Sequence, residues 1–253
     1  MKENIIRVLL VLAVGLVCVT PAAHGERPTW ARKATAFQVT CWERSDFHKC
    51  KSLRIASPDG KSSVEVEYQR VDEMMVAYLN LTTLGRDVRE VELPFYLGQN
   101  YELLWSPNSK AFFINCGCGS AIAGFVVSVY MIDSENIDVR PDFTQEAWHD
   151  MVRSFPPCKA LNHDPKECKL MQTDGEYYNM SGVDWLEDSS GIVVMSEVPS
   201  SPRYGGIMGQ VMGYELEVPS GKILGRLNAR QFKMKWQKSM AWKFRIPDPP
   251  EYQ

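Results

Sequence analysis

The chain has 253 residues, of which 45% are hydrophobic and 23% charged, and its formal net charge is −3. This length and composition are those of an ordinary globular protein with a sizeable core, in one large domain or two small ones. The slightly negative net charge argues against nucleic acid as a partner, so any contact with an anionic surface must come from a local basic patch.

The first 25 residues predict the compartment. Lys2 and Arg7 form a positively charged start, residues 5–19 are almost wholly apolar, and residues 21–25 offer small side chains ahead of Glu26. This order is typical of a cleavable secretory signal peptide. The alternative is an uncleaved anchor, but the apolar run is short for a membrane span. We therefore expect residues 1–25 to be removed, leaving a periplasmic or secreted protein without a transmembrane span.

Six cysteines follow the predicted signal peptide, and an even number in an exported chain indicates disulfides. They are Cys41, Cys50, Cys116, Cys118, Cys158 and Cys168. The first two are close enough in sequence to staple a loop within an N-terminal extension, residues 26–52, and the last two to staple a second loop. The middle two either bridge each other or pair elsewhere. The sequence does not choose among the 15 connectivities that six cysteines allow.

Beyond this extension, a short turn sequence recurs three times, at Ser57–Lys61, Ser106–Lys110 and Leu186–Ser190. Asp or Asn followed by Gly or Ser favours a tight turn. The strand predicted after the first turn, residues 64–68, alternates apolar and charged residues, which indicates one buried face. The segment after the second turn, residues 111–114, is continuously apolar, which indicates two.

Each turn begins a unit that reads turn, strand, loop, strand, turn, strand. The later strands are predicted at residues 76–81 and 88–93, 127–132 and 137–139, and 211–218 and 223–227. One such antiparallel sheet cannot bury its apolar faces alone, so we expect neighbouring units to stack. Trp105 and Trp185 would be large fillers at the seams. Residues 53–253 are therefore predicted to form one all-β domain of repeated antiparallel sheets.

The best of these turns, Trp105-Ser106-Pro107-Asn108-Ser109-Lys110, resembles the Trp-Ser-Pro-Asp-Gly-Lys-like word of TolB-type β-propeller repeats. The first turn lacks the Trp, and the third lacks the Pro and the Lys. The resemblance covers residues 53–247 and implies a propeller-like fold of about three to four blades. It also implies a scaffold that binds a protein or another ligand.

Ring closure is a separate question, because propellers close with four to eight blades and these units are unevenly spaced. The alternatives are an incomplete ring, a curved stack of sheets or a pair of packed sheets. The N-terminal stretch, residues 26–51, is a candidate source of additional strands. A ring completed by oligomerisation is a further alternative.

The repeat is interrupted by an insertion at residues 141–180. Asp142, with Gln145 three residues later, predicts the start of a helix. Apolar residues then recur at helical spacing; they are Ala147, Trp148, Met151, Val152 and Phe155. The prolines at 156 and 157 end the helix. A zinc site of Cys158, His163 and Cys168 is an alternative to a disulfide, but its spacing fits no short zinc-finger pattern, so no metal site is predicted.

Residues 221–247 contain eight Lys or Arg residues and no Asp or Glu. Residues 232–236 and 241–246 alternate apolar and basic side chains, which predicts a hairpin. Its polar face would bring together Lys233, Lys235, Lys243 and Arg245. Such a face suits an anionic glycan, a lipid headgroup or an acidic protein. The alternative is that outward lysines only protect an edge strand from aggregation.

Two further contact residues are Arg203 and Tyr204, at the tip of the loop predicted at residues 199–206. No Ser, His and Asp set can be assembled, so no catalytic residue or cofactor is predicted. A hydrolase, or a thiol-redox enzyme using Cys116 and Cys118, is the alternative. The sequence favours an exported binding or interaction scaffold whose ligand it does not identify.

Overall fold

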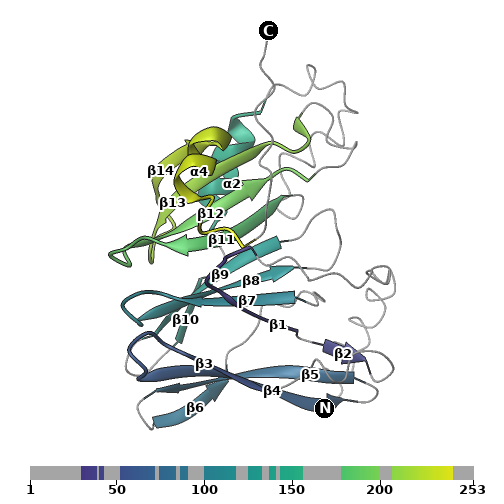
Figure 1. Ribbon diagram of the computed structural model, residues 1–253. Coiled ribbons are helices and arrows are strands. Elements are labelled where there is room, and N and C mark those ends of the chain that lie inside the picture. The colour runs from purple at the N-terminus through teal and green to yellow at the C-terminus, as the bar shows by residue number, and fades with distance from the viewer. Residues whose placement is uncertain are drawn as a thin grey trace, which may run out of the picture.

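The computed structural model describes residues 30–38, 40–42, 52–71, 74–83, 86–90, 100–117, 125–132, 137–140, 143–155, 178–199 and 207–241. Within these ranges the chain folds into three antiparallel sheets and two helices. The sheets lie one upon another in an open stack, and none of them closes on itself (Figure 1). The prediction of an all-β protein with repeated sheets and one helical insertion is confirmed.

Each predicted unit forms one sheet of the stack. The first contains β3 (Leu53–Ala56), β4 (Ser62–Val71), β5 (Met74–Thr83) and β6 (Arg86–Glu90). The middle sheet contains β7 (Asn100–Trp105), β8 (Ala111–Gly117), β9 (Phe125–Ile132) and β10 (Ile137–Arg140). The third contains β11 (Asn179–Trp185), β12 (Gly191–Glu197), β13 (Val211–Glu217) and β14 (Ile223–Asn228). In each sheet consecutive strands pair with one another.

The N-terminal segment, residues 30–42, connects all three sheets. Its strand β1 (Thr35–Gln38) pairs with β7, and β2 (Thr40–Trp42) pairs with β5. Ala31 forms an isolated bridge with Met240, which follows the last helix. This segment does supply additional strands, as predicted. It adds them to the first and middle sheets, however, and does not build a fourth unit in the described part of the chain.

The three turns share one geometry. Within each turn, Oδ1 of Asp59, Asn108 or Asp188 accepts a hydrogen bond from the backbone N–H two residues later, at 3.0 Å in every case. The residue directly after this Asp or Asn adopts the left-handed conformation, which is easy for Gly60 (φ 70°) but strained for Ser109 (φ 62°) and Ser189 (φ 61°).

The two serines of these turns also link neighbouring units. Ser109 Oγ accepts a hydrogen bond from Asp59 N at 3.1 Å, and Ser189 Oγ accepts one from Asn108 N at 3.0 Å. Each serine therefore contacts the turn of the preceding unit. This contact offers a physical reason for keeping serine at a position where glycine would relax the backbone.

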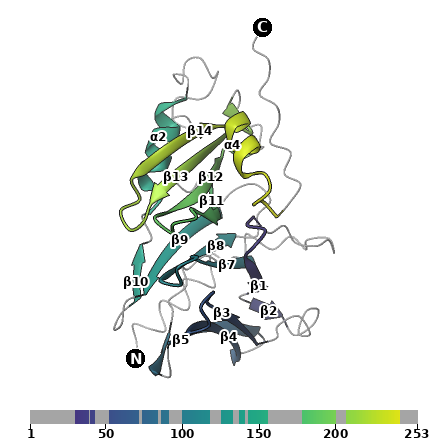
Figure 2. The same ribbon diagram turned by 60° about the vertical axis from the view of Figure 1, so that its left-hand side comes forward.

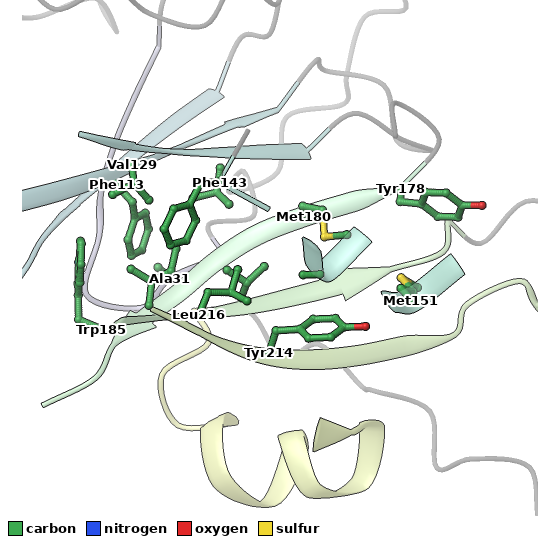
Figure 3. Packing of buried hydrophobic residues seen from close by; sticks show 14 of the residues in the cluster. Ala31, Phe113, Val129, Phe143, Met151, Tyr178, Met180, Trp185, Tyr214 and Leu216 are labelled. Carbon is green, nitrogen blue, oxygen red and sulfur yellow. The ribbon is translucent and has the colours of Figure 1, made fainter. Parts of the chain in front are cut away.

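The tryptophans that precede the second and third turns lie at the seams between sheets, as predicted. Trp105 Nε1 donates to Ile55 O at 3.1 Å, and Trp185 Nε1 donates to Leu104 O at 3.1 Å. Trp185 also stacks on Phe113 of the middle sheet, with ring centroids 5.8 Å apart (Figure 3). Each seam thus combines a buried aromatic side chain with one hydrogen bond to the preceding sheet.

The predicted helix in the insertion is α2 (Gln145–Arg153), which packs against β12 and β13 of the third sheet. Ala147 and Met151 are buried beneath it, as the helical spacing predicted. The predicted capping residue is wrong: Thr144 occupies the N-cap position, without a side-chain hydrogen bond, and Asp142 lies outside the described residues. The chain therefore enters the helix two residues later than the capping pattern indicated.

A polar contact fastens α2 to the third sheet. Asp150 Oδ2 accepts a hydrogen bond from Tyr214 OH at 3.0 Å and forms an ion pair with Arg226, whose Nε lies 3.1 Å away. Burial raises the pKa of Tyr214, and the Asp150 carboxylate raises it further. Tyr214 therefore remains a neutral hydrogen-bond donor, and Figure 3 shows its ring in the same cluster as Met151.

Candidate functional site

The basic C-terminal segment begins with a helix, α4 (Ala229–Trp236), and the predicted strand at residues 232–236 is wrong. Asn228 and Gln231 form a reciprocal capping box: Asn228 Oδ1 accepts from Gln231 N, and Gln231 Oε1 accepts from Asn228 N, both at 2.9 Å. This pair satisfies two backbone N–H groups at the helix start. The second strand of the predicted hairpin falls almost wholly at residues 242–246, outside the described residues.

The apolar residues of the segment explain why a helix forms here. Phe232 and Trp236 are four residues apart, so they lie on one helical face, and both pack against the third sheet. Phe232 lies over Gly213, where a Cβ atom would stand 1.9 Å from the Phe232 ring. The alternating pattern had grouped Met234 with these two residues, but Met234 points outward and is 79% exposed.

The helix separates two of the predicted site residues. Lys233 and Lys235 project roughly 200° apart around a helix axis, so they do not share a face. Lys235 Nζ lies 2.6 Å from Glu215 Oε1 and 5.4 Å from the centre of the Trp236 ring. Trp236 Nε1 donates to the same carboxylate oxygen at 3.2 Å. Lys235 therefore helps to hold α4 on the sheet.

Several other predicted residues lie outside the described ranges, so their roles and pairings stay predictions. They are Arg203, Tyr204, Lys243, Arg245, Cys50, Cys118, Cys158 and Cys168. Of Cys41 only the backbone is described, within β2. Cys116 lies in β8 and is wholly buried in the core between the first and middle sheets. Since thiol exchange requires solvent access, the position of Cys116 gives the redox alternative no support.

The outward side of α4 carries an unusual combination of side chains, which we call the basic surface and define as Arg230, Met234, Lys235 and Lys238. Arg230 and Met234 are one helical turn apart, and Lys238 follows in the turn after the helix. Arg230 and Lys238 are exposed, and neither side chain pairs with any residue that the structure describes. No Asp or Glu occurs between residues 221 and 241, so the local charge is positive.

The basic surface lies at one end of the molecule. Figures 1 and 2 show α4 as the outermost layer on the third sheet, with α2 on the opposite face of that sheet. Among the described elements, α4 therefore covers the face of the third sheet that is turned away from α2 (Figure 2). The sequence signal for this arrangement was the Asn228 and Gln231 capping pair, which outweighs the alternating pattern that follows it.

A second polar group, not anticipated from the sequence, is the buried Glu102 in β7, which is 4% exposed. Its carboxylate accepts hydrogen bonds from the backbone N–H groups of Trp30 and Ala31 and from Asn115 Nδ2. Burial raises the pKa of Glu102 to about 7, against the opposing effect of these hydrogen bonds. Because both carboxylate oxygens accept bonds from the chain itself, Glu102 anchors the N-terminal segment.

Asn115 extends this junction to the third sheet. Its Nδ2 donates to Gly182 O at 2.8 Å, and its Oδ1 accepts from Gly182 N at 2.7 Å. One side-chain amide thus satisfies both backbone groups of a residue in the neighbouring sheet. Glu102 and Asn115 each interrupt an apolar run, at residues 101–105 and 111–116. A lone polar residue inside a buried strand was the signal that sequence reasoning missed.

Within the described residues, Glu197, at the end of β12, is a second buried carboxylate with a strongly shifted pKa. It is 7% exposed, and Asn179 Nδ2 donates to its Oε2 at 3.3 Å. Burial raises the pKa of Glu197 to about 7. A carboxyl group in this range can exchange a proton near neutral pH, which is one requirement of a general acid or base. Glu197 also had no sequence motif around it to mark it.

The described residues contain no cluster of three or more His, Cys, Asp or Glu side chains suited to a metal ion. They also contain no helix with the length and hydropathy to cross a membrane. In comparisons with known proteins, no family model and no curated protein matches the chain.

Proposed function

We propose that the protein is an exported binding scaffold whose basic surface engages an anionic partner. The observation that carries this proposal is the pairing pattern on α4: Lys235 is neutralised by Glu215, whereas Arg230 and Lys238 project without a counter-charge in the described structure. Exposed charges of one sign attract a partner of the opposite sign and orient it during encounter.

The stack of sheets supports the scaffold part of the proposal. Its seams are filled by large aromatic side chains and fixed by hydrogen bonds between units, so the third sheet is a firm support for α4. The resemblance of the turns to TolB-type repeats also favours a role in binding. The signal peptide predicted at residues 1–25 favours a role in the periplasm or outside the cell.

The test is binding of heparin, as a soluble polyanion, to matched charge variants. Arg230→Glu combined with Lys238→Glu reverses two charges on the basic surface. Lys61→Glu combined with Lys110→Glu makes the same change in net charge on two exposed turns of the first and middle sheets. The control therefore separates a local surface effect from the effect of total charge.

We expect the wild type to bind heparin with an affinity that falls as salt rises, because exposed charges are screened. The Arg230 and Lys238 variant should bind at least about tenfold more weakly, whereas the turn variant should bind as the wild type does. Equal losses in the two variants would show that only net charge matters. If the wild-type protein does not bind heparin at low salt, the proposal is wrong.

A further inference from the structure

We infer that the anionic partner is a lipid membrane surface, on which the basic surface docks with Met234 inserted between the headgroups. This inference rests on the proposed function, because it names the partner of the same surface. It is carried by the position of an exposed apolar side chain between two exposed cationic side chains on and next to one helix.

Met234 is the most exposed large hydrophobic residue in the described structure, at 79%, compared with 50% for Leu224 and 47% for Met208. Its helix cannot rotate to bury it, because Phe232 fills the space over Gly213 and Trp236 is bonded to Glu215. The side chain is therefore held outward by packing on the other side of α4. An unbranched, flexible methionine adapts readily to an irregular apolar environment such as the upper part of a bilayer.

The charges around Met234 suit a layer of phosphate headgroups. Arg230 lies one turn before Met234, and Lys238 lies in the turn that follows the helix. The Arg230 guanidinium can donate two parallel hydrogen bonds to a phosphate, and Lys238 provides a compact positive charge. An interfacial helix lies in the membrane plane in this way, with apolar side chains inserted and cationic side chains at headgroup level.

The shape of the site favours a membrane over an acidic protein segment. Short peptides are generally recognised in a groove or along a sheet edge, where they contact more than one wall. The α4 helix instead stands as the outermost layer of the third sheet (Figures 1 and 2), and its Met234 side chain projects away from the protein. A broad surface such as a membrane can contact an exposed helix of this kind directly.

The experiment measures co-sedimentation of the intact protein with vesicles at physiological ionic strength. One set of vesicles contains equal parts of phosphatidylglycerol and phosphatidylcholine, and the other contains phosphatidylcholine alone. The test variants are Met234→Gln and the pair Arg230→Gln with Lys238→Gln. Their matched controls are Met208→Gln, at another exposed methionine, and the pair Lys61→Gln with Lys110→Gln.

We expect the wild type to bind only the anionic vesicles. Each neutralised cation should weaken binding about fivefold, so the Arg230 and Lys238 pair should lose roughly 25-fold. Loss of the inserted Met234 side chain should cost about tenfold. Both control proteins should bind as the wild type does.

Three outcomes overturn the inference. If the Met234 variant binds vesicles as well as the wild type, the methionine is not inserted. If heparin binding depends on Arg230 and Lys238 but anionic vesicles capture no protein, the anionic partner is not a membrane, and an acidic protein or glycan takes its place. In that case the proposed function survives. Absence of both heparin and vesicle binding removes both proposals.

Discussion

The buried Glu102 makes an unusual prediction about how stability depends on pH. Burial raises its pKa in the folded protein from the ordinary value of 4.5 to about 7. The folded state therefore holds a proton that the unfolded chain has already released between these two pH values. Stability must fall as pH rises through this window, opposite to the behaviour of a carboxylate in a salt bridge.

The size of this effect follows from the shift. One pKa unit corresponds to about 1.4 kcal/mol, so between about pH 5 and pH 8 Glu102 should remove roughly 2 to 3 kcal/mol from the free energy of unfolding. Glu197 has the same ordinary value and the same pKa of about 7, so it should contribute a similar amount. The two together are a large fraction of the stability of a typical domain.

Urea unfolding of the full chain at several pH values across this range measures the slope directly. Glu102→Gln should reduce the fall in stability by about half, and Glu197→Gln should remove most of the remainder. The glutamine at position 102 also places an N–H₂ group against backbone donors, so this variant should be less stable than the wild type at pH 5. That offset does not alter the slope, which is the quantity tested.

The reasoning is refuted if the stability of the wild type is flat or rises between pH 5 and pH 8. It is also refuted for Glu102 alone if the Gln variant keeps the full slope of the wild type. In that case the hydrogen bonds from Trp30, Ala31 and Asn115 would outweigh burial and keep the carboxylate ionised throughout. Glu197, with one side-chain amide at 3.3 Å, would then remain as the proton-binding group.

Three other sets of substitutions test the packing. Gly213→Val should detach α4 at a cost of about 1 to 3 kcal/mol in urea unfolding, because the first added carbon would lie 1.9 Å from the Phe232 ring. Gly225→Ala is its control and should cost less, because its added carbon would lie 3.0 Å from Glu215 Oε2. Asn115→Leu should cost about 3 kcal/mol, since it leaves both backbone groups of Gly182 without their partner; a stability equal to wild type would mean that the amide contact is dispensable. Trp185→Phe should cost about 1 kcal/mol for the lost hydrogen bond to Leu104, plus a smaller packing loss. Trp185→Ala should cost about 3 to 5 kcal/mol, because it also removes the ring from the seam. Equal costs for the two variants would show that the ring does not fill the seam.

The repeated units could be predicted because their signals are local. An Asp or Asn side chain that bonds to its own backbone two residues later defines a turn without help from the rest of the fold. The continuous apolar run at residues 111–114 then predicted a strand buried on both faces, and the structure buries every residue of β8. Strand positions and the stacking of sheets followed from these two observations.

The alternating run at residues 232–236 could not by itself predict the C-terminal helix, because a short run of alternating apolar and basic residues suits either a strand or a helix. The choice depended on Phe232 finding the space above Gly213, which is a contact between distant parts of the sheet and the segment. The capping pair of Asn228 and Gln231 was a local signal for the helix. The prediction that Lys233 and Lys235 share one face of a strand is therefore wrong, because both lie in α4.

The buried carboxylates had no local signal beyond their position in apolar strands. Glu102 is tolerated because two backbone N–H groups of the N-terminal segment and the Asn115 amide reach it. Those partners are 71, 72 and 13 residues away in the sequence. Neither the pairing nor the raised pKa follows from neighbours in the chain, so only the tertiary structure could reveal this junction.

The first and third sheets end the described stack in different ways, and the end at the third sheet leaves the basic surface exposed. The first unit has Ala56 where the others have Trp105 and Trp185, and Gly60 where they have the linking serines, so it lacks both side chains that reach a preceding unit. At the other end α4 covers the face of the third sheet on which a fourth unit would stack, and Phe232 fills its seam. Since α4 closes the stack, its outward residues have no neighbouring sheet to satisfy. Within the described structure, Arg230, Met234 and Lys238 are thus unconstrained by the packing of the repeat, as the proposed binding of a partner to the basic surface requires.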